Sequence, residues 1–320
     1  MIPFQHLYRL AAAVVLGASL VGTASAEETL RIGYQKSSTL LTLLKAQGDL
    51  EKQLAGQGIT VSWHEFASGL PLLEALNLGN VDVSADVADT VPVFAQAAGA
   101  KLTYFARETP SPLAQAILVP ADSPLNSLAD LKGKKIAVTK AAGSHYLLIQ
   151  ALAKAGLNFS DIEPAYLIPA DGRAAFENRK VDAWVTWDPF VASAQRQQHA
   201  RVLSDGKGLS NYQRYYLASS DYAKAHPQVL DTLFTALHQA GQWTKANPAE
   251  AAKVLGPLWG NLDVATVEQA NARRSYDVQP VGVDNLAEQQ QIADVFFAQG
   301  LLPRKIDANA VELFKPTARR

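Results

Sequence analysis

Short polar residues recur along this 320-residue sequence at points where an apolar run gives way to a helix-like pattern. The start of a helix carries free backbone N–H groups and the positive end of the helix dipole, and both favour an anion. One such turn is ordinary helix capping, whereas several that open into one crevice predict a site for a small anion. The candidate binding residues are Gln35, Ser37, Ser38, Ser68, Gly69, Asp86, Asp89, Gly143, Ser144, His145, Trp187 and Asp188.

One of these turns closes the run 181–190, Val-Asp-Ala-Trp-Val-Thr-Trp-Asp-Pro-Phe. The apolar part of the run predicts a buried strand. Asp188 can cap the first free N–H groups of a helix, and Pro189 fits the first helical turn, where no donor is needed. The strand would deliver Trp187 and a capped helix start to the sheet edge at which α/β proteins bind ligands. The alternative is a core strand with one surface tryptophan.

Gly143 and Ser144 open another helix. The flanking glycines of a hydrolase nucleophile elbow are missing, so we interpret this segment as a further strand-to-helix turn with exposed N–H groups. His145 could cap this helix, bind the ligand or lie on the rim of the crevice.

The composition excludes several classes of protein. The chain is 48% hydrophobic and 18% charged, with a formal net charge of -1, which indicates a soluble globular protein long enough for two lobes. A near-neutral charge argues against nucleic acid as a partner. Without cysteine there is no disulfide, thiolate metal site or cysteine nucleophile. The histidines are scattered, and no phosphate loop or complete dinucleotide fingerprint occurs, so we expect neither metal, cofactor nor catalysis.

Residues 1–26 have the pattern of a secretory signal peptide. His6 and Arg9 precede an apolar run from Leu10 to Val21, which is short for a membrane span. The small residues 24–26, Ala-Ser-Ala, are typical of a cleavage site. We therefore expect export and a mature chain that begins at Glu27; an uncleaved signal anchor is the alternative.

The mature chain alternates strand and helix patterns, which predicts an α/β fold. Segments 74–83 and 174–183 both read as helix, turn, Val-Asp and strand. This approximate internal repeat predicts two similar lobes whose strand ends face each other.

Two segments predict where the chain crosses between the lobes. The proline-rich break 109–112 is the candidate crossing into the second lobe, and 214–217 is the candidate return. We assign residues 27–109 and 217–320, including the C-terminal helices, to lobe 1, and residues 110–216 to lobe 2.

Six motifs resemble the aliphatic sulfonate-binding proteins of ABC importers, and the resemblance covers nearly all of residues 29–317. The motifs are Arg-Ile-Gly-Tyr-Gln-Lys at 31–36, Glu-Ala-Leu-Asn at 74–77, Phe-Ala-Gln-Ala-Ala-Gly-Ala at 94–100, Leu-Lys-Gly at 131–133, Val-Asp-Ala-Trp at 181–184 and Trp-Asp-Pro at 187–189. The resemblance implies a periplasmic-binding-protein type II fold with two α/β lobes and a ligand cleft between them. It also implies that a sulfonate is captured by the turns at 35–38, 68–69, 143–145 and 187–188, and is delivered to an inner-membrane permease with its ATPase.

The turn after the third strand departs from the family pattern. It reads Ser-Ala-Asp-Val-Ala-Asp at 84–89, which is longer and more acidic than the family's usual turn. Asp86 and Asp89 could favour an amino-sulfonate such as taurine, reject a second negative charge, or cap a helix in solvent. Taurine, sulfate esters and nitrate are thus alternative ligands. An exported hydrolase of sulfate esters is the alternative from another class, but it needs a nucleophile or metal with an organised base. We expect a monomeric binding protein and no enzyme.

The chemistry of a sulfonate predicts how it would be held. Its three oxygens share one charge, so N–H groups and hydroxyls at converging helix starts can satisfy them without a formal positive charge. We expect Ser38 and Ser144 to contact the head group and Trp187 to pack on the alkyl part. Arg173 and Lys36 are the alternative candidates for a direct ion pair.

Overall fold

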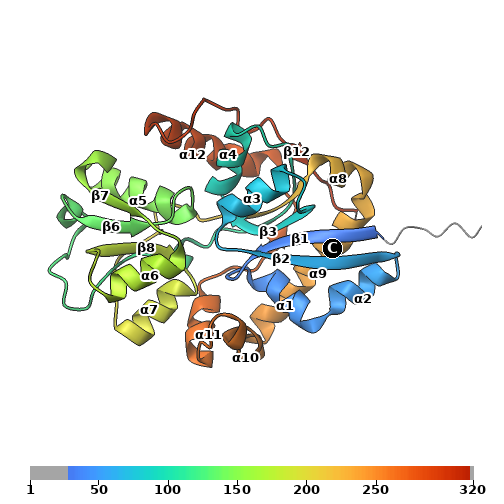
Figure 1. The fold of residues 1–320 in the computed structure, drawn as a ribbon, viewed down its shortest axis with the longest axis horizontal. Coiled ribbons are helices and arrows are strands. Elements are labelled where there is room, and N and C mark those ends of the chain that lie inside the picture. Colours follow the sequence, from blue (N-terminus) through green and yellow to red (C-terminus); the bar gives the residue numbers. More distant parts are fainter. Residues whose placement is uncertain (1–27, 318–320) are drawn as a thin grey trace, which may run out of the picture.

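The computed structural model describes residues 28–317, which form two α/β lobes side by side (Figure 1). The predicted signal peptide, residues 1–26, lies outside the described residues. The first lobe contains strands β1 (Glu28–Gln35), β2 (Ile59–Phe66), β3 (Val83–Ala88), β4 (Leu102–Glu108), β10 (Arg214–Ser219), β11 (Val278–Gln279) and β12 (Glu312–Leu313). The second contains β5 (Gln115–Val119), β6 (Lys135–Val138), β7 (Glu163–Tyr166), β8 (Ala183–Trp187) and β9 (Arg201–Asp205). The strand orders are β11-β4-β10-β3-β1-β2, with β12 beside β4, and β7-β6-β8-β5-β9.

Helices follow most of the parallel strands and cover the sheets. They are α1 (Thr39–Gln47), α2 (Asp49–Ala55), α3 (Gly69–Asn77), α4 (Thr90–Ala97), α5 (Gly143–Lys154), α6 (Pro169–Glu177), α7 (Phe190–Gln198), α8 (Ser220–Ala225), α9 (Pro227–Ala246), α10 (Pro248–Leu258), α11 (Val264–Ala272) and α12 (Ala287–Ala298). Short 3₁₀ turns lie at Pro112–Ala114, Leu128–Leu131, Phe159–Asp161 and Val283–Leu286. None of the helices within residues 28–317 combines the length and the apolar character that crossing a bilayer needs.

The central strand β10 shows where the chain returns to the first lobe. It pairs antiparallel with both β3 and β4, and all of its residues except Ser219 are buried. The sequence placed the return crossing at 214–217, but these residues already belong to the first sheet. The crossing therefore precedes Arg214. A strand buried on both faces lacks the polar alternation that would mark its start in the sequence.

Strand β3 also differs from expectation. The sequence predicted an acidic turn at 84–89, whereas β3 continues to Ala88 and Asp86 lies within it, fully buried. A charged side chain is almost never fully buried unless it is paired. The partners of Asp86 lie far away in the sequence, so local patterns did not reveal that this residue could belong to a strand.

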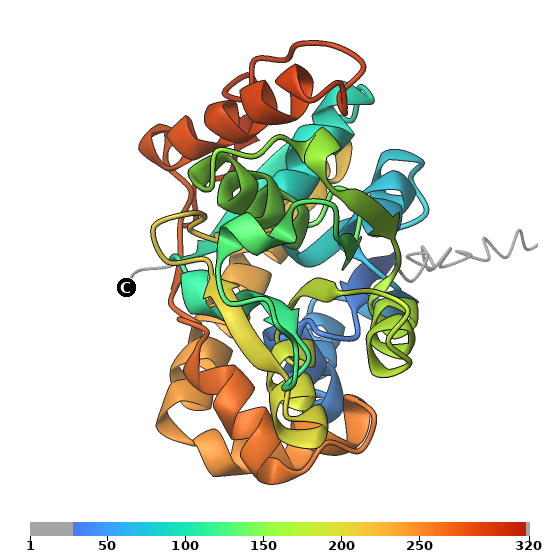
Figure 2. The ribbon, with the colours of Figure 1, turned by 90° about the vertical axis from the view of Figure 1, so that its left-hand side faces the viewer.

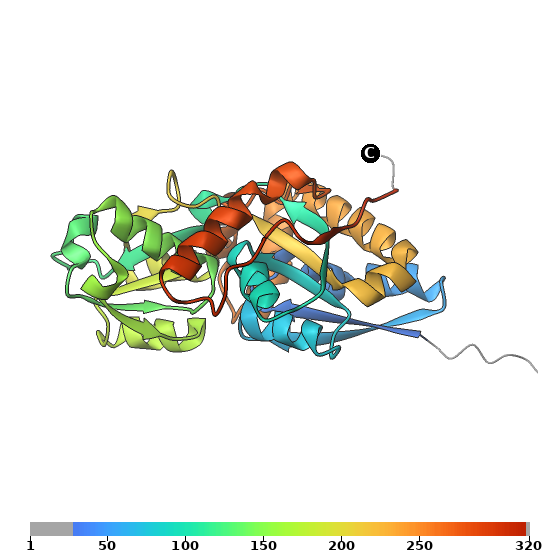
Figure 3. The ribbon, with the colours of Figure 1, turned by 90° about the horizontal axis from the view of Figure 1, so that it is seen from above.

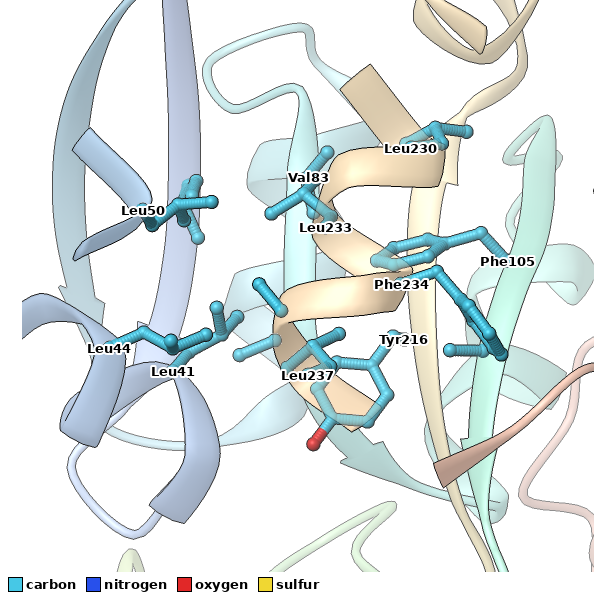
Figure 4. Close-up of a cluster of buried hydrophobic side chains, with 14 of the residues drawn as sticks. Leu41, Leu44, Leu50, Val83, Phe105, Tyr216, Leu230, Leu233, Phe234 and Leu237 are labelled. Atoms are coloured by element: carbon cyan, nitrogen blue, oxygen red, sulfur yellow. The ribbon is translucent and has the colours of Figure 1, made fainter. Parts of the chain in front are cut away.

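Helix α9 anchors the first sheet through one apolar stripe (Figure 4). Leu230, Leu233, Phe234 and Leu237 recur at the spacing of one helix face, and all are buried. They share a core cluster with Leu41 and Leu44 of α1, Val83 of β3, Phe105 of β4 and Tyr216 of β10. Burying each large side chain contributes about 1.5–3 kcal/mol. This packing holds the strands from which the turns of the candidate site begin.

The C-terminal helices α10, α11 and α12 lie near the boundary between the lobes (Figure 1). Figure 2 looks onto the second lobe, with α12 in red above it and α10 and α11 in orange below. Figure 3 shows α12 lying over the boundary between the lobes. Phe296 of α12 shares an apolar cluster with Val93 of α4 and with Tyr146 and Ile149 of α5. On the opposite side, Gln269 of α11 bonds Gln195 of α7. The two lobes therefore touch on both sides of the boundary.

Candidate functional site

A small cleft lies between the lobes, at the carboxyl ends of strands from both sheets. Its walls are formed by Gln35, Gly69, Ala88, Val91, Ala142, Gly143, Trp187, Tyr212 and Arg214. This is the position at which α/β sheets bind ligands. The free volume is about 10 Å³, which is about the space of one water molecule. An organic anion can therefore enter only when the lobes separate or the lining side chains move.

Two glycines bring helix starts to the cleft. Gly69 is the first residue of α3 and Gly143 is the first residue of α5. A Cβ atom on Gly143 would lie 2.6 Å from the ring of Tyr212, and one on Gly69 would lie 2.9 Å from Val91. A larger residue at Gly143 would displace Tyr212, and one at Gly69 would displace Val91 within the first lobe. The first residue of α3 in the first lobe and the first residue of α5 in the second therefore both line the cleft.

The predicted serines are all buried at these turns, but their hydroxyls are used differently. Ser38 Oγ accepts from the backbone N–H of Gln35 at 3.2 Å, and its own proton remains free to donate. Ser68 precedes α3 and makes no capping bond with its side chain. Ser144 is fully buried, and its hydroxyl has no hydrogen-bond partner within residues 28–317. A buried hydroxyl left unpaired costs about 1–3 kcal/mol, which a ligand oxygen beside it would recover.

The Trp187 side chain is buried in the cleft and contacts the opposite lobe; it does not lie on the protein surface. It is only 4% exposed, and its Nε1 donates to Ser37 Oγ of the first lobe at 3.2 Å. Its ring also belongs to the apolar cluster that contains Val91 and Tyr212. The alternative of a surface tryptophan is therefore wrong, and the ring is a wall of the cleft.

Asp188 supports the turn after Trp187 and does not line the cleft. Its Oδ1 accepts from the N–H of Ala192 at 3.0 Å, as expected of a helix cap, although α7 begins at Phe190 and Pro189 precedes it. Arg273, from the segment after α11, donates to both carboxylate oxygens at 3.1 and 3.2 Å. Burial raises the pKa of Asp188 to about 7, while Arg273 acts to lower it.

A closed network of buried charges includes the lining residue Arg214, and we call this network the floor of the cleft. Asp86 pairs with Arg214 at 2.6 Å and with Arg274 at 3.2 Å, and Arg274 pairs with Glu108 at 2.6 Å. All four side chains are at most 3% exposed. Tyr216 donates its hydroxyl to Glu108 at 2.8 Å. Two positive and two negative groups thus balance in a region without water access, where an unpaired charge would be very costly.

Asp86 and Asp89, the acidic residues of the predicted turn, are bonded to other residues of the protein and do not line the cleft. The Asp86 carboxylate forms ion pairs with Arg214 and Arg274. Gln35 Nε2 donates to the backbone oxygen of Asp86 at 3.1 Å. Asp89 and Gln213 exchange two hydrogen bonds of 2.9 Å, between the Asp89 N–H and the Gln213 carbonyl and between the Gln213 N–H and the Asp89 carboxylate. Burial raises the pKa of Asp89 to about 8. These contacts argue against either carboxylate selecting an amino group on a ligand.

His145 also lies away from the cleft. It is fully buried, and its ring lies 5.3–5.5 Å from the rings of Phe159, Tyr166 and Phe296. Its Nδ1 accepts from the backbone N–H of Ala141 at 3.3 Å. Burial lowers the pKa of His145 to about 4, so the ring is neutral at pH 7. His145 therefore neither caps the helix nor lies on the rim, and it instead accepts a hydrogen bond from the turn before the helix.

Arg214 and Tyr212 line the cleft and were missed by the sequence analysis. Arg214 Nη1 donates to Tyr212 Oη at 2.7 Å, and Nη2 donates to the Asp86 carbonyl at 3.0 Å. The signal that could have identified Arg214 is a single basic residue in an otherwise apolar segment, 214–217, which the sequence analysis interprets as a crossing between the lobes.

The two cations that the sequence suggested for a direct ion pair, Arg173 and Lys36, lie elsewhere. Arg173 bonds Glu177 and Gln197 on the surface, and exposed Lys36 lines a separate pocket of the first lobe.

The donor set gives the cleft its chemistry. Its lining includes the first residues of α3 and α5, the guanidinium of Arg214, and aromatic and aliphatic side chains. The Ser144 hydroxyl belongs to the residue that follows the lining residue Gly143. Each terminal nitrogen of Arg214 has two N–H groups and uses one of them, so one on each remains. Within the part of the chain that the structure describes, no cluster of three or more His, Cys, Asp or Glu residues could hold a metal ion.

Comparison with known proteins identifies relatives with the same architecture. The sequence pattern described as NMT1/THI5 like matches residues 54–251. A protein of Escherichia coli strain K12 named as an aliphatic sulfonates-binding protein is 39% identical over 315 residues, which are 98% of each chain. The crystal structure of the periplasmic aliphatic sulphonate binding protein SsuA from Escherichia coli gives a TM-score of 0.81 at 40% identity, covering 90% of this chain and 97% of that one.

A second solved structure is the alkanesulfonate-binding protein SsuA from Xanthomonas axonopodis pv. citri, bound to MOPS. It gives a TM-score of 0.82 at 42% identity, covering 87% of this chain and 95% of that one. These matches confirm the predicted fold. The chain therefore belongs to the family of aliphatic sulfonate-binding proteins and has the fold of the periplasmic binding proteins.

Proposed function

We propose that this protein captures aliphatic sulfonates in the periplasm and delivers them to the permease and ATPase of an ABC importer for sulfur uptake. The observation that carries the proposal is the convergence of the α3 and α5 starts and Arg214 in one buried cleft, with the unpaired hydroxyl of buried Ser144 next in sequence to the lining residue Gly143. Three sulfonate oxygens need several donors that approach from different directions. The cleft supplies them from both lobes, so the ligand would be enclosed when the lobes close.

The charge balance of the cleft favours a monoanion. Arg214 is positive, but its charge is already compensated by Asp86, and Arg274 is compensated by Glu108. A ligand with one delocalised charge can be held by the remaining N–H groups and by the helix dipoles. A ligand with two charges would bring a second charge into the cleft without a counter-ion. This favours a sulfonate over sulfate or phosphate.

The residues that line the cleft also favour some of the alternative ligands over others. Taurine carries an ammonium group, and no carboxylate belongs to the described lining of the cleft. We therefore rank an unsubstituted alkanesulfonate above taurine. A sulfate ester or nitrate has a similar monoanionic head group, and these remain the other candidates. Hydrolysis of the ester is disfavoured, because the lining contains no nucleophile paired with a base.

The remaining parts of the proposal concern export and assembly. We infer that residues 1–26 are removed on export and that the mature protein acts as a monomer. Mass spectrometry of the protein recovered from the periplasm should give a chain that begins at Glu27, because the small residues 24–26 form the cleavage site. A dominant species that retains Met1 would contradict cleavage.

The ligand class can be tested by isothermal titration calorimetry of the purified mature protein. We expect one-to-one binding of methanesulfonate, butanesulfonate and MOPS, weaker binding of taurine, and little binding of sulfate. Binding of nitrate with no sulfonate binding would contradict the proposal. Octyl sulfate incubated with the protein provides a second control, since released inorganic sulfate would show hydrolysis in place of binding.

Substitutions at the helix starts should weaken binding of every sulfonate. Ser144→Ala and Ser38→Ala each remove one hydroxyl donor, so we expect a loss of about 1.5–3 kcal/mol in binding free energy, as for a hydrogen bond to a charged group. Calorimetry with butanesulfonate measures this loss. Arg173→Ala and Lys36→Ala are matched controls, because Arg173 is paired with Glu177 and Gln197 on the surface and exposed Lys36 lines a separate pocket. If these controls abolished binding while the serine variants did not, the site would be elsewhere.

Replacement of Trp187 should change the dependence of affinity on chain length. Trp187→Ala removes the aromatic wall, so we expect butanesulfonate to lose more affinity than methanesulfonate. Trp187→Phe keeps a ring but removes the donor to Ser37, and it should retain most of the preference for the longer chain. An equal loss for both ligands in Trp187→Ala would show that the ring does not contact the alkyl part.

A further inference from the structure

We propose that His145 is a positioning residue that holds the ligand-binding start of α5 in place and links it to lobe closure without touching the ligand. This inference rests on the proposed function, because it assigns a role at the same cleft. It concerns the turn 139–142, which connects β6 to α5 and leads directly to the lining residues Ala142 and Gly143.

The turn contains a strained residue. Ala141 has a φ of 63°, in the left-handed region that residues with a Cβ atom rarely adopt, and it is fully buried. Such a conformation costs free energy and persists only where the surrounding contacts determine it. The conformation matters because Ala141 sets the direction in which the following N–H groups enter the cleft.

Two hydrogen bonds hold Ala141, one from each lobe. Its N–H donates to Nδ1 of His145 at 3.3 Å. Its carbonyl oxygen accepts from Oγ1 of Thr90 at 2.6 Å, and Thr90 is the first residue of α4 in the first lobe. The bond from His145 lies within the second lobe, whereas the bond from Thr90 crosses the boundary. The turn therefore reaches its complete set of bonds only when the lobes are together.

The imidazole ring of His145 is packed among aromatic rings near the boundary between the lobes. Because Nδ1 accepts a hydrogen bond, the proton of the neutral ring is on Nε2, which has no hydrogen-bond partner within the described residues. Aromatic rings surround it, and an N–H group directed at an aromatic ring retains a weak interaction. One of these rings is Phe296 of α12, which packs against α4 of the first lobe. Contact with Phe296 and the bond from Thr90 are thus made in the same closed arrangement.

This arrangement gives closure a direct effect on the anion site. Closing the lobes adds the Thr90 bond and the Phe296 contact, and both stabilise the Ala141 conformation that presents the start of α5. A ligand held by Gly143 and Ser144 stabilises the same conformation. By thermodynamic linkage, ligand binding and closure therefore favour each other through this turn.

Two substitutions separate the hydrogen bond from the packing. His145→Asn places an amide oxygen where Nδ1 lies but removes the ring, whereas His145→Phe keeps an aromatic ring but removes the acceptor. For butanesulfonate, calorimetry should show an affinity near wild type for His145→Asn and a loss of about three- to tenfold for His145→Phe. Thermal stability should rank in the opposite order, since it follows packing. If affinity followed stability in both variants, His145 would be a packing residue only.

The bond across the lobes is tested in the same way at Thr90. Thr90→Val removes the hydroxyl at nearly constant volume, and Thr90→Ser keeps it. We expect weaker sulfonate binding and a larger radius of gyration in small-angle scattering for Thr90→Val, with Thr90→Ser near wild type. Equal values for the two variants would overturn the link to closure.

A measurement without ligand distinguishes failure of this inference from failure of the proposed function. Amide hydrogen exchange at Ala141 should be slow in wild type and in His145→Asn, and faster in His145→Phe. Equal protection in the two variants would overturn the positioning role whether or not sulfonates bind. If Ala141 exchange followed the expected order but no sulfonate bound to wild type, the ligand assignment would fail and the positioning role would stand.

Discussion

The buried ion network of Asp86, Arg214, Arg274 and Glu108 is the constraint on which the rest of the site depends. Each charge loses its hydration on folding, and removing one member would leave another buried without a partner, at a cost of about 3–5 kcal/mol. The network therefore requires β3, β4, β10 and the segment after α11 to meet at one point. That point is the floor of the cleft, so the same interaction that orders the first lobe also fixes the position of Arg214 in the cleft lining.

The second lobe is attached to this floor by the turns that form the site. Trp187 bonds Ser37, the carbonyl of Ala141 accepts from Thr90, and Asp188 pairs with Arg273. Each of these contacts joins a strand-to-helix turn of the second lobe to the first lobe. The turns that hold the lobes together are therefore also the turns of the proposed site. At that site, separating the lobes would remove the α5 donors from one side of the ligand and leave those of α3 and Arg214 on the other.

Sequence patterns were sufficient for the α/β fold and for the position of most turns, because both follow from local periodicity and capping. Gly69, Gly143 and Trp187 were found in this way and do line the cleft. The ion network was not predictable, since Asp86 is 128 residues from Arg214 and 188 from Arg274. Without those partners, Asp86 looked like a turn residue and Arg214 like part of a linker. His145 was misplaced for a related reason, because its aromatic surroundings include Phe296 from a distant helix.

The neutrality of the cleft floor bears on release as well as on capture. A free arginine would attract an anion whether the lobes were open or closed, since an ion pair needs little geometric agreement. Here Arg214 is neutralised by Asp86, so at the proposed site the ligand would depend on directional donors from both lobes. Opening the lobes would remove one set of these donors, and no uncompensated positive charge in the network would keep the anion. A transport protein that must surrender its ligand is better served by this arrangement than by a permanent counter-ion.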